Sequence, residues 1–369
     1  MDEVIQLTQD LIRFKSMNSR PGEINRCADF IESYFKKHTI AYRRMDYNGT
    51  PSLLAIPDNN RIPVLLMSHI DVVDGPETVF NPYIKDGKLF GRGSIDDKYA
   101  AALSMVLFKT FLSRHRKNGM DQKDMPFGIL ITGDEEVGGY NGAKLIFNQI
   151  KPDFCIALDG GIVTKVVTRE KGLLTLKLMA KGKAAHGARP WLGENAIENL
   201  FADYQILKRF FKETADGNWH RTINFSFIKA GKSFNQVPDY AEAIFDIRYT
   251  ENDDIDGLYE KMSRAVKSEL VIERREPMFH GGESTYLDLL LDLSDEIHVG
   301  FEHGASDARF LSDHGIKGIV WGANGDSSAH TLDEHINIDS LLKLYGLLES
   351  YMDSVAKIPF DQPSTEPVK

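Results

Sequence analysis

The sequence contains few cysteines, no long apolar run and no excess of positive charge. Only two of its 369 residues are cysteine. Cys27 falls in a predicted helix and Cys155 in a predicted buried strand, so we expect both to be reduced core residues. No apolar stretch is long enough to span a bilayer, and the first residues, MDEVIQLTQDLIRF, lack the basic and apolar regions of a signal peptide. We therefore predict a cytoplasmic protein without a membrane partner.

The charge balance argues against further classes of partner. The net charge is −10, which disfavours a nucleic-acid-binding surface and a polybasic membrane anchor. Hydrophobic residues make up 42% of the chain and charged residues 27%, as in ordinary globular proteins. A chain of this length can bury a large core and is expected to form more than one domain.

One apolar run ends on two side chains that bind metals well. Val64–Met67 is continuously apolar, which predicts a strand buried on both faces of a parallel sheet. His69 and Asp71 follow it directly. In an open α/β sheet, ligands bind just past the carboxyl ends of the strands, so we expect a site here.

Three other segments place acidic residues at similar positions. Two follow apolar runs, in FGILITGDEE and FCIALDGG, and one lies at a glycine-rich turn, in FGRGSIDDK. The carboxylates concerned are Asp96, Asp97, Asp134, Glu135, Glu136 and Asp159. Together with His69 they predict one metal site that is fed by several strand ends.

The order of the predicted elements indicates a discontinuous α/β domain with a smaller domain inserted in it. Up to residue 168, apolar strands alternate with helices, one of them at 141–150, which predicts a mixed, mostly parallel sheet flanked by helices. Residues 169–278 follow the order of a ferredoxin-like (βαββαβ) domain. Residues 279–369 return to the first pattern, with helices at 285–298 and 340–356. The last residues, DQPSTEPVK, are expected to form a loose tail.

The candidate ligands suit a pair of cations in a hydrolytic site. Such a site needs imidazoles and carboxylates as ligands, one bridging carboxylate, and a free carboxylate to accept a proton from water. The candidate ligands are His69, Asp96, Glu136, Asp159 and His330. A set without thiolates suits zinc, cobalt or manganese and does not choose among them.

The motifs, taken in order, resemble a known family. They are HIDVVDG, GRGSIDDK, GDEEVGG, ALDGG, AAHGARPWLGENAI, FNQVPDYAEAIFDIR, GASDARF and AHTLDEHI. This series is similar to the M20 family of metallopeptidases and N-acyl-amino-acid deacylases, and it covers nearly the whole chain. The resemblance implies a di-metal hydrolase that acts on small peptides or N-acyl amino acids. It also implies two divalent ions, zinc first, and a homodimer formed through an inserted lid and dimerisation domain.

The resemblance assigns a role to each motif residue. It implies that His69 and Asp159 bind one metal, that Glu136 and His330 bind the other, and that Asp96 bridges them. Glu135 matches the general base, which takes a proton from the bridging water, and Asp71 matches the carboxylate that orients His69.

The inserted domain and the SDAR segment supply the other implied residues. His186 resembles the histidine that stabilises the oxyanion from the partner subunit. Asn235 and Arg248 resemble residues near the substrate, and Arg248 suits a bidentate grip on a carboxylate. Arg309 is a second candidate for that grip.

Two positions depart from the usual pattern or separate its branches. Asp159 stands where deacetylases and desuccinylases generally have Glu and where di- and tripeptidases have Asp, which favours a peptidase. Tyr99 stands where the family usually has Gly, at the start of the helix after Asp97.

Each motif also has a plainer interpretation when it is taken alone. His69 and Asp71 could form a surface turn, and Glu135 and Glu136 a helix cap. Arg248 could be an interstrand ion pair. The ordered occurrence of all the motifs makes such coincidences a poor account. Two functional alternatives remain: a deacylase of the acetylornithine or succinyl-diaminopimelate type, and a non-catalytic protein that binds a metal or ligand.

Overall fold

The computed structural model describes residues 2–57, 61–212 and 214–358, so the predicted tail at 361–369 lies outside the described residues. The chain divides into two compact units. Unit 1 comprises Met1–Arg169, His280–Phe301 and Ser306–Lys369, and unit 2 comprises Glu170–Phe279 and Glu302–Ala305.

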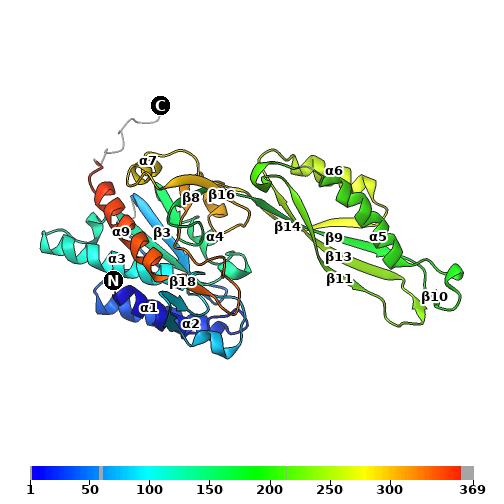
Figure 1. The fold of residues 1–369 in the computed structure, drawn as a ribbon, viewed down its shortest axis with the longest axis horizontal. Helices are drawn as coiled ribbons and strands as arrows, with labels where there is room; N and C mark the ends of the chain where they lie inside the picture. The colour runs from blue at the N-terminus through cyan, green and yellow to red at the C-terminus, as the bar shows by residue number, and fades with distance from the viewer. Residues whose placement is uncertain (1, 58–60, 213, 359–369) are drawn as a thin grey trace. The chain divides into compact units, whose positions relative to one another are not determined.

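Unit 1 is built on a nine-stranded mixed sheet, drawn in Figure 1. Its strand order is β1-β2-β6-β3-β7-β17-β8-β15, and β16 also pairs with β8. The strands are β1 (Arg43–Tyr47), β2 (Thr50–Ala55), β3 (Val64–His69), β6 (Phe127–Thr132), β7 (Phe154–Ala157), β8 (Lys165–Glu170), β15 (Phe279–His280), β16 (His298–Glu302) and β17 (Lys317–Val320).

The four central strands are parallel and buried. β3 pairs in parallel with β6 and β7, and β7 pairs in parallel with β17. Every residue of β3, β6 and β7 is buried, because helices cover both faces of this part of the sheet. Burying a Leu or Ile side chain such as Leu66 or Ile156 contributes roughly 1.5–3 kcal/mol. The predicted fold class, a mostly parallel sheet flanked by helices, is confirmed.

The helices of unit 1 pack their apolar sides on the sheet and on one another. α3 (Lys98–Lys117) lies on β3 and β6, and α1 (Asp2–Ile12) and α9 (Ile338–Val355) lie beside it (Figure 1). α2 (Pro21–Lys37) packs on β2.

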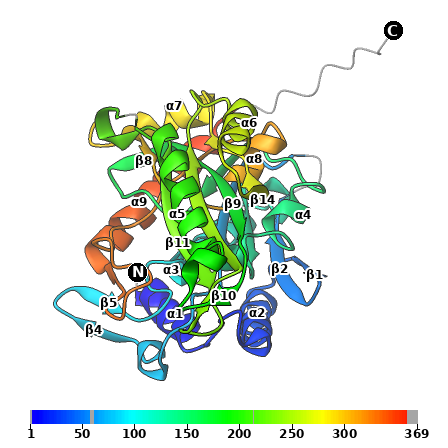
Figure 2. The ribbon, with the colours of Figure 1, turned by 90° about the vertical axis from the view of Figure 1, so that its right-hand side faces the viewer.

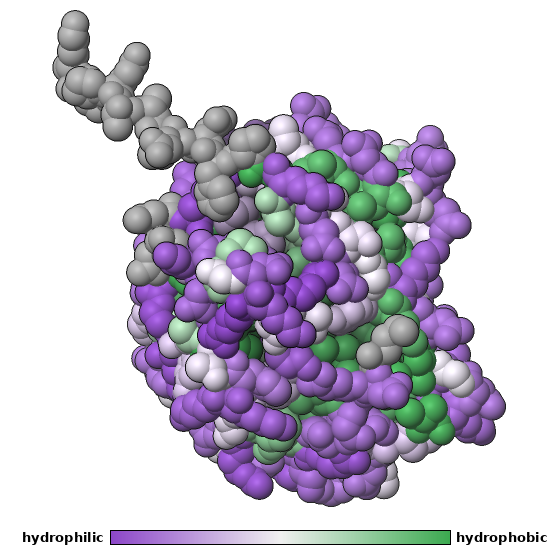
Figure 3. Space-filling view, turned by 90° about the vertical axis from the view of Figure 1, so that its left-hand side faces the viewer, coloured by the Kyte–Doolittle hydropathy of each residue, from purple (hydrophilic) through white to green (hydrophobic). Residues whose placement is uncertain are grey.

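Polar side chains cover most of the face drawn in Figure 3, with hydrophobic patches between them. Within the described residues, none of the helices has the length and apolar composition needed to cross a bilayer.

A small three-stranded sheet joins two loops of unit 1 that are far apart in sequence. It consists of β4 (Tyr83–Lys85), β5 (Lys88–Phe90) and β18 (His335–Asn337). His335 pairs with Phe90 in this sheet, and the Gly91 N–H donates to the Glu334 carbonyl at 2.9 Å. The turn that carries Asp96 is therefore held beside the loop that carries His330.

Unit 2 has the ferredoxin-like order. Its elements are β9 (Gly172–Lys181), α5 (Ala196–Leu207), β11 (Thr222–Ala230), β13 (Tyr240–Tyr249), α6 (Ile255–Ala265) and β14 (Glu269–Glu276). The strands form one antiparallel sheet in the order β11-β13-β9-β14. Both helices pack on one face of it (Figure 2), where Leu176 and Phe245 are fully buried. Burial alternates along β9 and β13, as expected for a sheet covered on one face.

Two predicted helices are much shorter than expected. The helix expected at 141–150 is α4 (Ala143–Ile146), and the helix expected at 285–298 is α7 (Thr285–Leu291). α7 ends at Asp292 because the next residues, Leu293–Glu296, are mostly polar and form turns. His298 then begins β16 instead of ending a helix. α8 (Arg309–Asp313) is a further short helix of unit 1.

Candidate metal centre

Four parallel strands direct their carboxyl ends to one edge of the large sheet. β3 ends on His69 itself, β6 ends just before Gly133 and Asp134, and β7 is followed by Leu158 and Asp159. The chain after β17 leads through a loop to His330. Parallel strands bring such residues together because their carboxyl ends lie at the same edge.

The side chains converge in two overlapping groups. In each group the ligand atoms all lie within 4.8 Å of one another. One group is His69, Asp96 and Asp159, and the other is Asp96, Glu136 and His330. Asp96 therefore belongs to both.

Asp96 divides its two carboxylate oxygens between two imidazoles. Oδ1 lies 3.0 Å from Nε2 of His69, and Oδ2 lies 2.9 Å from Nε2 of His330. Asp159 Oδ2 lies 3.8 Å from the same His69 nitrogen, and Glu136 Oε2 lies 3.4 Å from the same His330 nitrogen. Each imidazole nitrogen thus faces two carboxylate oxygens.

The tautomer of His69 shows that this group suits a cation. Nδ1 of His69 lies 3.0 Å from the main-chain carbonyl of Asp71, which can only accept, so Nδ1 carries the proton of the neutral ring. In the neutral ring, which is the form that binds a metal, Nε2 presents a lone pair towards the oxygens of Asp96 and Asp159. Despite the short distance to Asp96, this buried nitrogen has no hydrogen bond of acceptable geometry within the described part of the chain. Lone pairs that converge in this way fit a divalent cation, and the nitrogen and oxygen donors suit zinc, cobalt or manganese.

The same arrangement shifts the pKa values of the ligands. Asp96 and then Glu136 raise the pKa of His330 to about 10. Burial opposes the charge on Asp96, but His330 and His69 outweigh burial and keep the pKa of Asp96 well below its usual value. Burial likewise disfavours a charged His69, yet Asp71 and Asp96 outweigh it and raise the pKa of that imidazole. Without a cation, protons on the imidazoles balance the carboxylates.

Asp71 lies beside His69, the residue that it is predicted to orient, and it also accepts hydrogen bonds from the turn that carries Glu135 and Glu136. Its carboxylate is fully buried and lies 3.5 Å from Nδ1 of His69. Asp71 Oδ1 also accepts the N–H of Glu135 at 3.1 Å, and Oδ2 accepts the N–H of Glu136 at 3.0 Å. One buried carboxylate therefore fixes the turn that carries both acidic residues.

Glu135 and Glu136 point to different places from adjacent positions. Glu136 Oε1 accepts the N–H of Val73 at 3.0 Å, while its Oε2 faces His330. Glu135 belongs to neither ligand group and lines a small cavity with His69 and Asp159. Burial, and then the charge of Asp159, raise the pKa of Glu135 well above its ordinary value.

A buried ion pair that the motif analysis did not single out organises the Asp96 turn. Arg92 and Glu334 are both 2% exposed, and they form a hydrogen-bonded salt bridge. Glu334 Oε1 also accepts the N–H groups of Gly93 at 2.8 Å, Ile95 at 3.3 Å and Asp96 at 3.4 Å. Through these hydrogen bonds the pair holds the main chain of the turn, and removing one partner of such a buried pair typically costs about 3–5 kcal/mol. Its only sequence signal is a charged residue in each of two motif loops.

Arg309 lies near the centre but is enclosed. It is 3% exposed, and its two Nη atoms donate to the main-chain carbonyls of Ser306 at 2.6 Å and Gly138 at 2.8 Å. These contacts hold the loop after Glu136 against the loop before α8. Both contacts engage the guanidinium with main-chain carbonyls, and the predicted grip on a substrate carboxylate stays a prediction.

The three predicted residues of unit 2 fall into two places. His186, on β10 (Ala185–His186), pairs with Gln236 of β12 (Gln236–Val237), so it lies next to Asn235. Arg248 lies near the far end of β13, eight residues after Tyr240 or roughly 26 Å along the strand. There it donates two hydrogen bonds to Asp246, at 2.8 and 3.1 Å.

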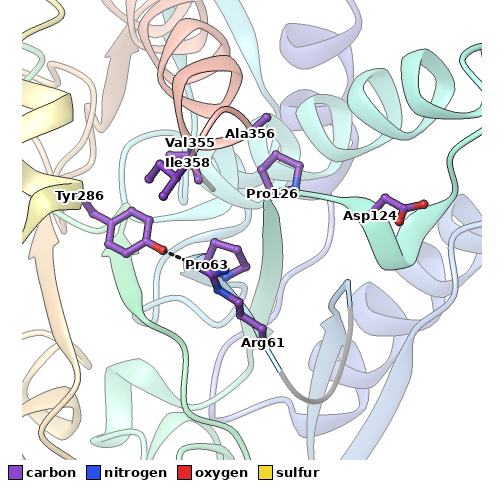
Figure 4. A pocket seen from close by; sticks show the side chains of 8 residues that line it. All are labelled: Arg61, Pro63, Asp124, Pro126, Tyr286, Val355, Ala356 and Ile358. Atoms are coloured by element: carbon purple, nitrogen blue, oxygen red, sulfur yellow. Dashed lines mark hydrogen bonds between the residues drawn. The ribbon is translucent and has the colours of Figure 1, made fainter. Parts of the chain in front are cut away.

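The pocket in Figure 4 lies at the opposite edge of the sheet. Pro63 and Pro126 line it, and they directly precede β3 and β6, so it sits at the amino ends of these strands. Two of its polar lining residues bond each other, since Arg61 donates to the Tyr286 hydroxyl at 3.4 Å, and both also donate to Asp153. None of the candidate metal ligands lines it.

Comparisons with known proteins show the family and the fold. Residues 65–354 match the model of peptidase family M20/M25/M40. The chain is 27% identical to a probable succinyl-diaminopimelate desuccinylase from Staphylococcus aureus, over 92% of this chain and 94% of that protein. Its fold is similar to the aminopeptidase PepT from Bacillus cereus, with a TM-score of 0.76, 20% identity and coverage of 96% and 99%. An M20 family metallo-carboxypeptidase from Sulfolobus solfataricus also gives a TM-score of 0.76, with 19% identity and coverage of 96% and 100%.

The pKa of His330 in the metal-free protein tests this geometry. In chelator-treated protein we expect the His330 ring to titrate near pH 10, and Asp96→Asn should lower that pKa because one of its two carboxylate neighbours is lost. Since the folded pKa lies above the ordinary 6.5, His330 stabilises the fold fully below pH 6.5, and this contribution disappears as the pH rises through about 10. NMR titration of the ring, assigned with His330→Gln, measures it. Asp313→Asn is the control, and a wild-type value near 6.5 would contradict the arrangement.

Proposed function

Because the chain belongs to peptidase family M20/M25/M40, we propose that it uses two divalent cations to hydrolyse an amide bond in a small peptide or N-acyl amino acid. The observation that carries the proposal is the Asp96 carboxylate, whose two oxygens face two different imidazoles. That arrangement suits a carboxylate that bridges two cations.

Each of the two ligand groups is proposed to bind one cation. His69, Asp96 and Asp159 hold one, and Asp96, Glu136 and His330 hold the other. When bound, such cations polarise the scissile carbonyl and lower the pKa of a water molecule so that it can attack near neutral pH. Zinc fits the donor set, as do cobalt and manganese.

Glu135 is the proposed general base. It lines the cavity beside His69 and Asp159 without belonging to a ligand group, so its carboxylate stays available for proton transfer. It takes a proton from the attacking water and passes it to the leaving amine. The hydrogen bond from the Glu135 N–H to the Asp71 carboxylate holds the main chain of Glu135 in place for this role.

His186 is the proposed donor to the oxyanion of the tetrahedral intermediate. Nδ1 of His186 accepts the N–H of Ala188 at 3.0 Å, so the neutral ring carries its proton on Nε2. Nε2 is therefore a hydrogen-bond donor on an exposed side chain. We propose that it serves the site of a second copy of the chain, with unit 2 acting as lid and dimerisation domain.

The favoured substrates are di- or tripeptides. Asp159, in place of Glu, supports this choice. Arg248 is proposed to grip the substrate carboxylate and Asn235 to lie close to the substrate. Because the two lie at opposite ends of β13, they would serve the sites of different copies of the chain. The alternative, an N-acyl-amino-acid deacylase, is supported by the resemblance to a probable desuccinylase at 27% identity. A cytoplasmic location and a homodimer stay predictions. The non-catalytic alternative has less support, because the chain keeps both Glu135 and the full ligand set.

Replacing Glu135 tests the mechanism. Glu135→Ala should lower kcat at least ~10²–10⁴-fold, because general-base catalysis is lost, while metal content stays near that of the wild type. Metal analysis and turnover of the best peptide substrate measure the two effects, and Glu296→Ala, an exposed glutamate of unit 1, is the control. Substantial activity in Glu135→Ala would show that the mechanism is wrong.

A substrate panel separates the functional alternatives. We expect metal-loaded protein to hydrolyse di- and tripeptides with higher kcat/KM than N-acetyl or N-succinyl amino acids, each assayed by amine release. The reverse order would establish the deacylase. A metal-loaded preparation that cleaves none of these amides would support a non-catalytic binding protein.

Mixing two inactive variants tests whether His186 acts across an interface. Glu135→Ala and His186→Ala should each be inactive as homodimers. If His186 acts on the partner's site, one site of each mixed dimer has both residues, so random exchange should restore about one quarter of wild-type activity. Sedimentation confirms that dimers are present. No recovery in exchanged dimers, or an active wild-type monomer, would contradict the proposal.

A further inference from the structure

The tyrosine that replaces the usual glycine after Lys98 is buried beneath the metal centre. Tyr99 is the second residue of α3, three positions after Asp96, and it is 1% exposed. Its hydroxyl donates to the Leu158 carbonyl at 2.6 Å and accepts the Ala323 N–H at 3.1 Å. Burial raises the pKa of Tyr99 well above its ordinary value, so the hydroxyl keeps the proton that it donates.

These contacts lie just past the carboxyl ends of the parallel strands β7 and β17. The Trp321 N–H still donates to the Ala157 carbonyl at 2.8 Å, in the manner of the β7–β17 ladder. One step further along, the Tyr99 hydroxyl stands between the Leu158 carbonyl and the Ala323 N–H. It therefore bonds one main-chain group from the segment that follows each of the two strands.

Gly322 provides the space for this hydroxyl. A Cβ added at Gly322 would lie 2.6 Å from the Tyr99 oxygen and 2.6 Å from the Gly160 carbonyl oxygen. Both contacts are too short for a real side chain. Tyr99 and Gly322 thus form a matched pair.

The two residues that belong to only this ligand group, His69 and Asp159, are tied to the hydroxyl through Leu158. Asp159 directly follows Leu158. The Leu158 N–H donates to the Met67 carbonyl at 2.9 Å, two residues before His69. In contrast, Glu136 is held through Val73 and Asp71, and His330 lies seven residues beyond Ala323.

We propose that Tyr99 is a positioning residue for the cation held by His69, Asp96 and Asp159. It acts through the main chain at Leu158 and has little influence on the cation held by Glu136 and His330. The inference rests on the proposed function, since it requires that both groups bind a cation.

Cobalt titration of the full-length, chelator-treated protein tests the inference. Tyr99→Phe removes only the hydroxyl and should weaken Co²⁺ binding 10–100-fold at one of two sites, as loss of a supporting partner typically does. Calorimetry and the Co²⁺ absorption bands follow the two binding phases. The phase weakened should be the one that Asp159→Asn weakens, and not the one that His330→Ala weakens.

The matched control is Tyr351→Phe. Tyr351 is also fully buried in unit 1, and its hydroxyl donates to the Tyr286 carbonyl at 3.0 Å in the α7–α9 contact, away from the ligands. It should leave both Co²⁺ phases unchanged. Gly322→Ala, which keeps the hydroxyl but crowds it, should weaken the same phase as Tyr99→Phe, so the inference can be tested even if one variant fails to fold.

The possible failures are distinguishable. Wild-type Co²⁺ affinity at both sites in folded Tyr99→Phe would overturn the inference, and so would weakening of the His330 phase or equal weakening in Tyr351→Phe. Wild-type protein that binds no Co²⁺ or Zn²⁺ would instead overturn the proposed function.

Discussion

The centre depends on one carboxylate between two imidazoles. Asp96 directs one oxygen to His69 and the other to His330, and these residues come from parts of the chain more than 200 residues apart. In the absence of a cation, this arrangement shifts the pKa values of all three groups. Two cations would replace the protons that otherwise balance the carboxylates, which is why we place them on either side of Asp96.

The rest of unit 1 makes that arrangement possible. The strands β3, β6 and β7 are hydrogen-bonded to one another in a fixed register, in which His69 lies opposite Thr132 and Met67 opposite Ala157. The residues at their carboxyl ends are therefore placed precisely enough to share a ligand. The loops that follow are fixed by buried groups: Asp71 holds the Glu135–Glu136 turn, and Glu334 with Arg92 holds the Asp96 turn. Each loop is therefore held by a buried carboxylate that has a partner of its own, His69 for Asp71 and Arg92 for Glu334.

Much of this was predictable because strands that are buried on both faces appear in the sequence as short apolar runs. The run before His69 marks a strand covered on both faces, and the acidic residues after similar runs had to meet at one edge. The βαββαβ order of unit 2 was equally visible. What could not be predicted depends on contacts between distant residues. No local pattern pairs Arg92 with Glu334, 242 positions away, or shows that the Arg309 guanidinium is enclosed by main-chain carbonyls. The prediction of a helix over 285–298 was wrong at its end for a related reason. β16 begins at His298 and pairs with β8, which is a contact between distant residues that the local sequence does not show.

The most direct test of the central claim is anomalous X-ray diffraction from crystals grown with Zn²⁺. The account predicts two zinc peaks about 3.5–4 Å apart, one on each side of the Asp96 carboxylate. One should contact His69 and Asp159, and the other Glu136 and His330. A single peak, a peak that does not contact Asp96, or no peak in protein shown to be folded would contradict it.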